Sequence, residues 1–212
     1  WTSGVINETR PISDTPSLGQ HASIGAASGD NIIVASRGIT NGNMELALNT
    51  GTSGFGPMTM SGANNMRDAD IVVGSDGMMH ISYVNAGSGD LVYFSTTEWP
   101  NANNLVHVNL EAVQNTYHSS IDVDSYNNPF VVYMDDAGNK IRLKYRLEST
   151  WYEALVDGNP SFRPTIQIDD YNNVHINYVS SNGTLMHALS TERMNNFSSW
   201  SISEIAGPSS SL

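Results

Sequence analysis

The sequence lacks several residue types, and each shortage excludes a class of protein. Its 212 residues contain no cysteine, which excludes a disulfide framework and a thiolate metal site. Only nine lysines and arginines stand against 21 aspartates and glutamates, so the formal net charge is −12. Because phosphate contacts need a basic face, we expect neither nucleic acid nor an anionic membrane surface as a partner. No run of 18 apolar residues exists, so membrane insertion is not expected.

Lysine and helical periodicity are also scarce. Lys140 and Lys144 are the only lysines, whereas Asn, Ser, Thr and Gly are abundant. A polar but weakly charged surface of this kind is common in secreted proteins, so the composition favours an extracellular or cell-surface location. No stretch sustains the 3.6-residue period of an amphipathic helix, which predicts almost no helix.

What the chain does contain is a repeat. Residues 119–133 combine an alternating strand pattern, a short polar turn and an apolar strand, and the same pattern returns at 165–178. With Ile121 as the register mark, its equivalents are Ile24, Ile71 and Ile166, at spacings of 47, 50 and 45 residues. Four short strands in each such unit, separated by Gly, Asn and Asp turns, are typical of a β-propeller blade.

The prediction is therefore an all-β fold, a β-propeller built of four-stranded antiparallel blades. Its blades are expected at 16–63, 64–113, 114–158 and 159–207. The expected first strands are 23–26, 70–73, 120–123 and 165–168, and the expected second strands are 32–35, 79–83, 130–133 and 174–178. A β-sandwich needs no internal repeat, and a β-helix repeats at shorter periods.

The first 15 residues are predicted to form a spare outer strand, since Trp1 to Ile6 resembles the fourth-strand runs at 151–156 and 200–205. Three arrangements would accommodate it. The chain is a segment of a larger propeller, or the spare strand pairs with another subunit, or four blades close into a ring with this strand on an edge. An unpaired strand edge attracts partner strands, so self-association is one expectation.

The run from Ser120 to Tyr133, followed by Lys140 to Tyr145 and then Trp151, resembles the repeat of secreted, sialidase-like (BNR-type) β-propeller proteins. The resemblance extends over residues 16–207. It implies a propeller fold. Because the family includes glycan hydrolases, lyases, lectins and unassigned surface proteins, the resemblance selects no single function. It also implies that ligands bind where the chain enters each first strand and leaves each second strand.

The position three residues before each register isoleucine is the main candidate for ligand binding. It holds an ionisable residue in every unit: His21, Asp68, His118 and Arg163. Neighbouring candidates on the same face are Arg67, Tyr117 and Phe162 before the first strands, and Arg37, Asn85, Asp135, Asp136 and Ser180 after the second strands. These side chains would form a polar funnel, with Tyr117 or Phe162 stacking on a sugar; a merely solvated rim is the alternative.

A catalytic version of this site uses the same residues. His118 as base, Tyr117 as acid and Arg163 neutralising a carboxylate would suit a lyase acting on acidic sugars. Asp68, or the pair Asp135 and Asp136, would supply the carboxylates of a glycosidase.

No cofactor is expected and no metal site is assigned. The alternating oxygens of Asp122 to Asn127 resemble a calcium loop, but the stretch lacks the central glycine and distal glutamate of an EF-hand. A hairpin turn explains it better, because 169–173 repeats the turn without that spacing.

Three functions remain open from the sequence. The first is an extracellular recognition module for a glycan or a protein partner. The second is a glycan-active enzyme, a polysaccharide lyase or a sialidase-like hydrolase, on the same face. The third is a structural subunit of a surface assembly.

Overall fold

A computed structural model describes residues 18–27, 31–38, 44–49, 55–59, 65–97, 108–111, 116–135, 139–158, 160–192 and 197–207. Every helix or strand in these ranges is a β-strand. None of the described elements is an apolar helix of membrane-spanning length. The spare strand predicted at 1–15 lies outside the described residues.

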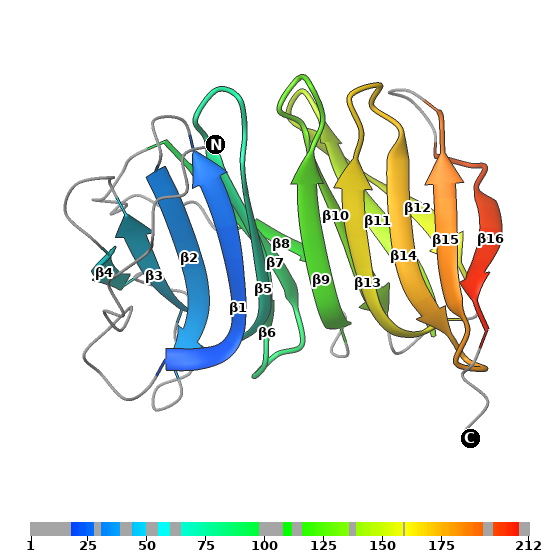
Figure 1. Ribbon diagram of the computed structural model, residues 1–212, viewed down its shortest axis with the longest axis horizontal. Helices are drawn as coiled ribbons and strands as arrows, with labels where there is room; N and C mark the ends of the chain where they lie inside the picture. The colour runs from blue at the N-terminus through cyan, green and yellow to red at the C-terminus, as the bar shows by residue number, and fades with distance from the viewer. Residues whose placement is uncertain are drawn as a thin grey trace, which may run out of the picture.

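The strands form four antiparallel sheets of four, which is the predicted blade (Figure 1). The first sheet contains β1 (Leu18–Ala27), β2 (Asn31–Gly38), β3 (Met44–Asn49) and β4 (Phe55–Thr59). The second contains β5 (Met66–Val73), β6 (Met79–Asn85), β7 (Leu91–Thr96) and β8 (Val108–Glu111). The third contains β9 (Thr116–Val123), β10 (Pro129–Asp135), β11 (Lys140–Leu147) and β12 (Thr150–Asp157). The fourth contains β13 (Pro160–Ile168), β14 (Val174–Ser180), β15 (Leu185–Ser190) and β16 (Ser201–Ala206).

The first strands lie side by side in the order β1, β5, β9, β13. Figure 1 shows the four sheets as an open arc, with its gap toward the viewer. One of the three arrangements considered from the sequence was a closed ring of four blades. That arrangement is wrong for this chain.

The core lies between consecutive blades. Ile71, Ile121 and Ile166 are 4%, 4% and 8% exposed, and each packs against the preceding blade. Tyr83, Tyr133 and Tyr178 occupy equivalent second-strand positions and face the same way, almost fully buried. Because burying such a side chain contributes roughly 1.5–3 kcal/mol, these repeated positions hold the blades together.

The hairpins between first and second strands explain why Gly and Asn recur there. Gly77, Asn127 and Asn172 are equivalent residues, with φ of 79°, 63° and 62°. Each amide also donates to the carbonyl three residues earlier, as in a type I turn followed by a left-handed residue. Glycine and asparagine adopt this left-handed conformation more readily than other residues, so the sequence suits the turn.

The same asparagines join neighbouring blades. The Asn127 Oδ1 accepts the Ser75 amide at 2.8 Å, and the Asn172 Oδ1 accepts the Ser125 amide at 2.8 Å. Each asparagine therefore holds the turn of the blade before it.

Candidate functional site

The first strands are longer than the sequence predicted. They begin at Met66, Thr116 and Pro160 rather than at residues 70, 120 and 165. The strand pairing slips between Arg67 and Asp70, beside Tyr133 and Met134, and between Phe162 and Thr165. The candidate residues at these slips, predicted to lie in loops leading into the strands, are in fact bulge residues inside them.

These bulges hold three of the predicted ligand residues in an unfavourable backbone conformation. Asp68, His118 and Arg163 have φ of 50°, 51° and 40°. A non-glycine residue in this left-handed region costs on the order of 1–3 kcal/mol. Arg163 also precedes Pro164, and a residue before proline normally favours an extended backbone. Strain repeated at one position in three blades marks this position as a candidate site.

The three residues line one cavity. Its volume is about 340 Å³, and its remaining walls come from the two positions that follow them in each blade. Those residues are Ala22, Ser23, Ala69, Asp70, Ser119, Ser120, Pro164 and Thr165. The cavity therefore lies among the first strands of all four blades, at the end of the strands opposite the Asn-containing turns.

Charged groups of both signs occur in this cavity. The His118 Nδ1 lies 3.3 Å from the Asp68 Oδ1, and both side chains are mostly buried. Arg163 is exposed and forms no hydrogen bond or ion pair with any residue that the structure describes. The cavity therefore offers a paired carboxylate and imidazole together with a guanidinium that is free to bind a ligand.

Asp70 forms the floor of the cavity. Its carboxylate accepts the Ser23 hydroxyl at 2.5 Å and the Ser120 hydroxyl at 2.7 Å. It also accepts the Ile121 amide at 3.0 Å. One side chain therefore ties the first three blades together.

Sequence reasoning missed this floor, although a signal was present. The residue directly before each register isoleucine is Ser23, Asp70, Ser120 or Thr165, a side chain with a hydroxyl or carboxyl oxygen in every unit. On an innermost strand, the main hydrogen-bond partners within reach of such a side chain are the equivalent residues of adjacent blades.

Other predicted candidates have different roles. The Arg67 Nη2 donates to the Thr116 carbonyl at 2.9 Å, which joins two blades. The Asn85 Oδ1 accepts the Gly87 amide and shapes the turn after β6. Asp135 is buried and accepts the Arg142 Nε at 2.9 Å. None of these residues lines the cavity.

Several predicted side chains cannot be placed. His21, Arg37, Tyr117 and Phe162 lie in β1, β2, β9 and β13, but their side chains are outside the described part of the structure. Asp136 is outside it altogether. Ser180 is the last residue of β14, and its hydroxyl donates a hydrogen bond to the Thr184 carbonyl in the turn that follows.

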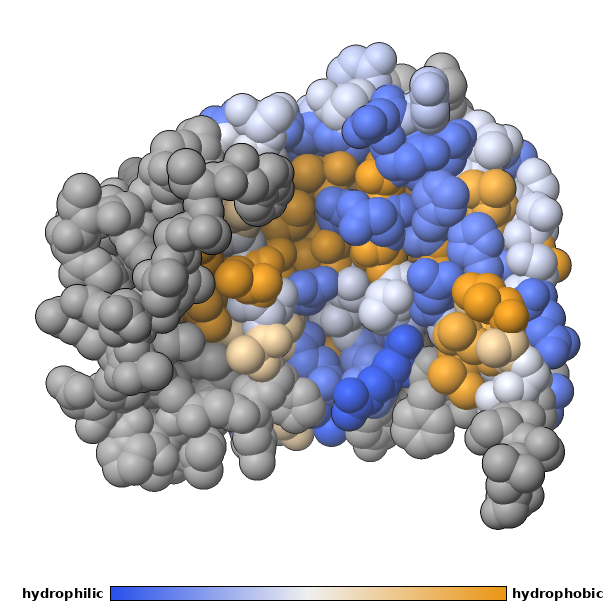
Figure 2. Space-filling model, in the orientation of Figure 1, coloured by the Kyte–Doolittle hydropathy of each residue, from blue (hydrophilic) through white to orange (hydrophobic). Residues whose placement is uncertain are grey.

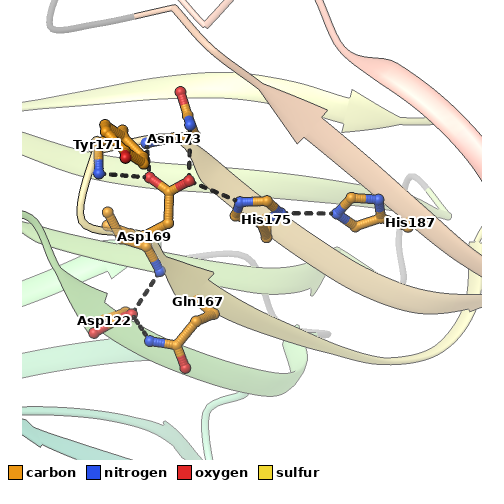
Figure 3. Close-up of polar contacts among 8 residues, drawn as sticks. Asp122, Gln167, Asp169, Tyr171, Asn173, His175 and His187 are labelled. Atoms are coloured by element: carbon orange, nitrogen blue, oxygen red, sulfur yellow. Dashed lines mark hydrogen bonds and ion pairs between the residues drawn. The ribbon is translucent and has the colours of Figure 1, made fainter.

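The acidic stretch that resembles a calcium loop serves the scaffold. The Asp124 carboxylate accepts the amides of Tyr126 and Asn128 and the side-chain amide of Asn128. The Asp122 Oδ2 accepts the Ile168 amide at 2.7 Å and the Gln167 side chain at 2.8 Å (Figure 3). Burial raises the pKa of Asp122, and the backbone amides oppose that rise.

No protein-family model matches this sequence, and no curated protein matches it significantly. Solved structures do match. The BP39L lectin from Burkholderia pseudomallei superposes with a TM-score of 0.70 at 14% identity, over 95% of this chain and 59% of the lectin. The fold is that of a β-propeller.

Two further propellers show the range of functions among structures with this fold. The six-bladed, fucose-recognising lectin of the fungus Aleuria aurantia has a TM-score of 0.60 at 14% identity, over 92% of this chain and 65% of the lectin. The NanB sialidase from Streptococcus pneumoniae has a TM-score of 0.56 at 12% identity, over 73% of this chain and 26% of the enzyme. The chain thus spans about three fifths to two thirds of the two lectins.

Proposed function

We propose that this chain is an extracellular carbohydrate-binding β-propeller, and that it binds its glycan in the cavity lined by Asp68, His118 and Arg163. The observation that carries the proposal is the repetition of strained, ionisable residues around one cavity. Polar side chains held in fixed directions suit a ligand with many hydroxyl groups, since each hydroxyl both donates and accepts a hydrogen bond. The lectin structures that share the fold support a glycan as the ligand.

Each residue has a distinct expected role. The Asp68 carboxylate accepts hydroxyl groups of the sugar, and His118 holds that carboxylate in place. The Arg163 guanidinium donates to ring or acidic oxygens in a planar, two-point arrangement.

The test is a glycan array with the intact chain, in calcium and in chelator, followed by affinity measurements on the best ligand. Arg163→Ala should weaken binding at least tenfold, because a charge-assisted hydrogen bond contributes about 1.5–3 kcal/mol. Tyr171→Ala is the matched control, since Tyr171 is 70% exposed at the opposite end of the first strands. Unchanged affinity in Arg163→Ala, or equal loss in Tyr171→Ala, would contradict the proposed site.

The pairing of His118 with Asp68 favours one alternative, a glycan-active enzyme at the same site. In acid–base catalysis a carboxylate commonly orients an imidazole in this way. Incubation with acidic polysaccharides and analysis of chain length distinguishes the two functions. Depolymerisation that His118→Ala abolishes would establish the enzyme, whereas binding without depolymerisation supports the lectin-type function.

A further inference from the structure

One face of each of the first three blades packs against the following blade, and the residues on this face are buried inside the arc. In β6 these are His80, Ser82 and Val84, each 0% exposed. The Ser82 hydroxyl bonds the Ser119 hydroxyl of the next blade at 3.2 Å. In β10 the equivalent residues are Phe130, Val132 and Met134, at 4%, 0% and 7% exposed. We call this side of a blade its following face.

The following face of the last blade has no described neighbour. Val174, Ile176 and Tyr178 of β14 pack against the third blade, so the alternate residues His175, Asn177 and Val179 project to the other side. These three are only partly buried. Figure 1 shows the sheet of β13 to β16 with this face toward the viewer, and Figure 2 shows it as hydrophilic residues with a hydrophobic patch at the lower right.

A histidine contact on this face repeats one that is buried between the second and third blades. The His80 Nδ1 lies 2.8 Å from the Tyr93 hydroxyl, across β6 and β7. His175 and His187 occupy the equivalent places in β14 and β15, and the His175 Nδ1 lies 3.1 Å from the His187 Nε2 (Figure 3). The His175 Nε2 is 3.4 Å from the Asp169 Oδ2, which orients the ring. The last blade therefore carries the side-chain arrangement of a blade interface.

The first blade is exposed on its opposite side, its preceding face. Ile24 is the register isoleucine of that blade and is 65% exposed, whereas Ile71, Ile121 and Ile166 are at most 8% exposed. Burial of this isoleucine stabilises the packing of the other three blades, and that contribution is missing here. Both ends of the arc therefore present blade-packing surfaces.

The curvature of the arc determines how many further blades would close it into a ring. The chain superposes on 65% of a lectin described as six-bladed, close to the share that four blades of six represent. The gap between the two exposed faces thus corresponds to two blades. A second four-blade copy would not fit the gap while engaging both faces.

We propose that the following face of the last blade docks a further blade of the same repeat, and that two such blades join it to the preceding face of the first blade. The docking blade presents a branched aliphatic residue at the register position of its first strand and a tyrosine on its second strand. These are the residue types with which Ile71, Tyr83 and their equivalents cover the preceding blade.

The test extends the full chain at its C-terminus with a second copy of residues 64–158, which carries the second and third blades. Amide hydrogen exchange in β14 and β15 should slow at least about tenfold relative to the 212-residue chain, and the extended chain should sediment as a monomer. The control is the same extension with Ile71→Asp and Tyr83→Asp in the copied segment. Equal exchange in the extended chain and its control would overturn the proposal.

Ile24→Asp supplies a second measurement. In the 212-residue chain this exposed position should tolerate aspartate with no shift in the unfolding midpoint, whereas in the extended chain the midpoint should fall, because Ile24 is then buried. A midpoint that falls equally in both chains would contradict the proposal. So would a 212-residue chain that dimerises, protects β14 from exchange and dissociates with Ile24→Asp, since a second copy would then be the occupant.

Discussion

The two ends of β5, β9 and β13 use the same unusual backbone conformation with very different residues. At the hairpin end, the left-handed positions are occupied by Gly77, Asn127 and Asn172. At the cavity end, they are occupied by Asp68, His118 and Arg163. The hairpin end has glycine and asparagine, which adopt this backbone most readily, whereas the cavity end has ionisable residues in their place.

Under the proposed function, this difference separates the residues that the fold requires from those that a ligand would require. A hairpin needs a positive φ and selects the residue that provides it most easily. The bulges also need a positive φ, and glycine would satisfy them, yet three different ionisable residues stand there. The strain is offset by the packing of the surrounding strands, and the proposed binding role gives a reason for these side chains to stand there.

The largest expected effect is at the hairpin end. Asp124→Ala removes a carboxylate that accepts three N–H groups and should destabilise the chain by about 3 kcal/mol. Urea unfolding measures this change, and Asp170→Ala, at an exposed turn residue of the last blade, is the control. Glycan affinity should remain unchanged. If both variants unfold at the same urea concentration, the carboxylate does not organise the hairpin.

Asn127→Ala should destabilise the fold by about 2 kcal/mol, because it removes the hydrogen bonds from the Ser75 amide and hydroxyl and leaves an alanine in the left-handed region. Asn127→Gly keeps the backbone conformation and should destabilise the fold by about 1 kcal/mol, through the lost hydrogen bonds alone. Thermal unfolding of the two variants separates the contributions of conformation and contact. Equal destabilisation by alanine and glycine would argue against a conformational role for Asn127.

At the cavity end we expect a substitution to increase the stability of the fold rather than to decrease it. Arg163→Gly should stabilise the fold by about 1 kcal/mol, since it relieves the positive φ and removes no hydrogen bond or ion pair with a described residue. Arg163→Ala keeps the strain and should leave the unfolding midpoint nearly unchanged, while both variants lose glycan binding. A destabilised Arg163→Gly would show that the arginine is there for stability.

The smallest expected effect is the loss of folding stability at low pH that results from protonation of Asp169. Desolvation opposes ionisation of Asp169, but hydrogen bonds from Asn173 and His175 hold its pKa at about 2. A carboxyl whose folded-state pKa is lowered stabilises the fold above about pH 4, and that contribution is lost as pH falls toward 2. Unfolding midpoints of the parent chain should therefore decline more between pH 4 and pH 2 than those of Asp169→Asn. Parallel pH profiles would contradict this role of Asp169.

Much of the fold follows from local sequence. The spacing of the register isoleucines and the Gly or Asn at each turn predict the hairpins and the four-stranded sheets, because these features depend on neighbouring residues. The first strands were predicted too short for a physical reason. A bulge inserts one residue into the alternation, so the pattern before Asp70, Ser120 and Thr165 no longer shows a period of two.

The candidate site was predictable only in part. The ionisable residues before each register isoleucine drew attention because they vary where the rest of the repeat does not. The partners of Arg67 and Asp135 could not be predicted, since Arg67 bonds a residue 49 positions away and Asp135 bonds an arginine that the sequence gives no reason to choose. Arg67 reaches into the next blade, and Asp135 pairs diagonally across β10 and β11, so neither contact is specified by the residues next to it in the sequence.

The Asp70 carboxylate has a consequence for how such a protein evolves. The asparagine links between turns are the same at successive blades, so a duplicated blade would fit beside its parent without new chemistry. Asp70 instead contacts Ser23 on one side and Ser120 on the other, an arrangement that appears once among the described residues. The first three blades are thus tied to their order through Asp70, and duplication of the fourth blade alone would leave this arrangement intact.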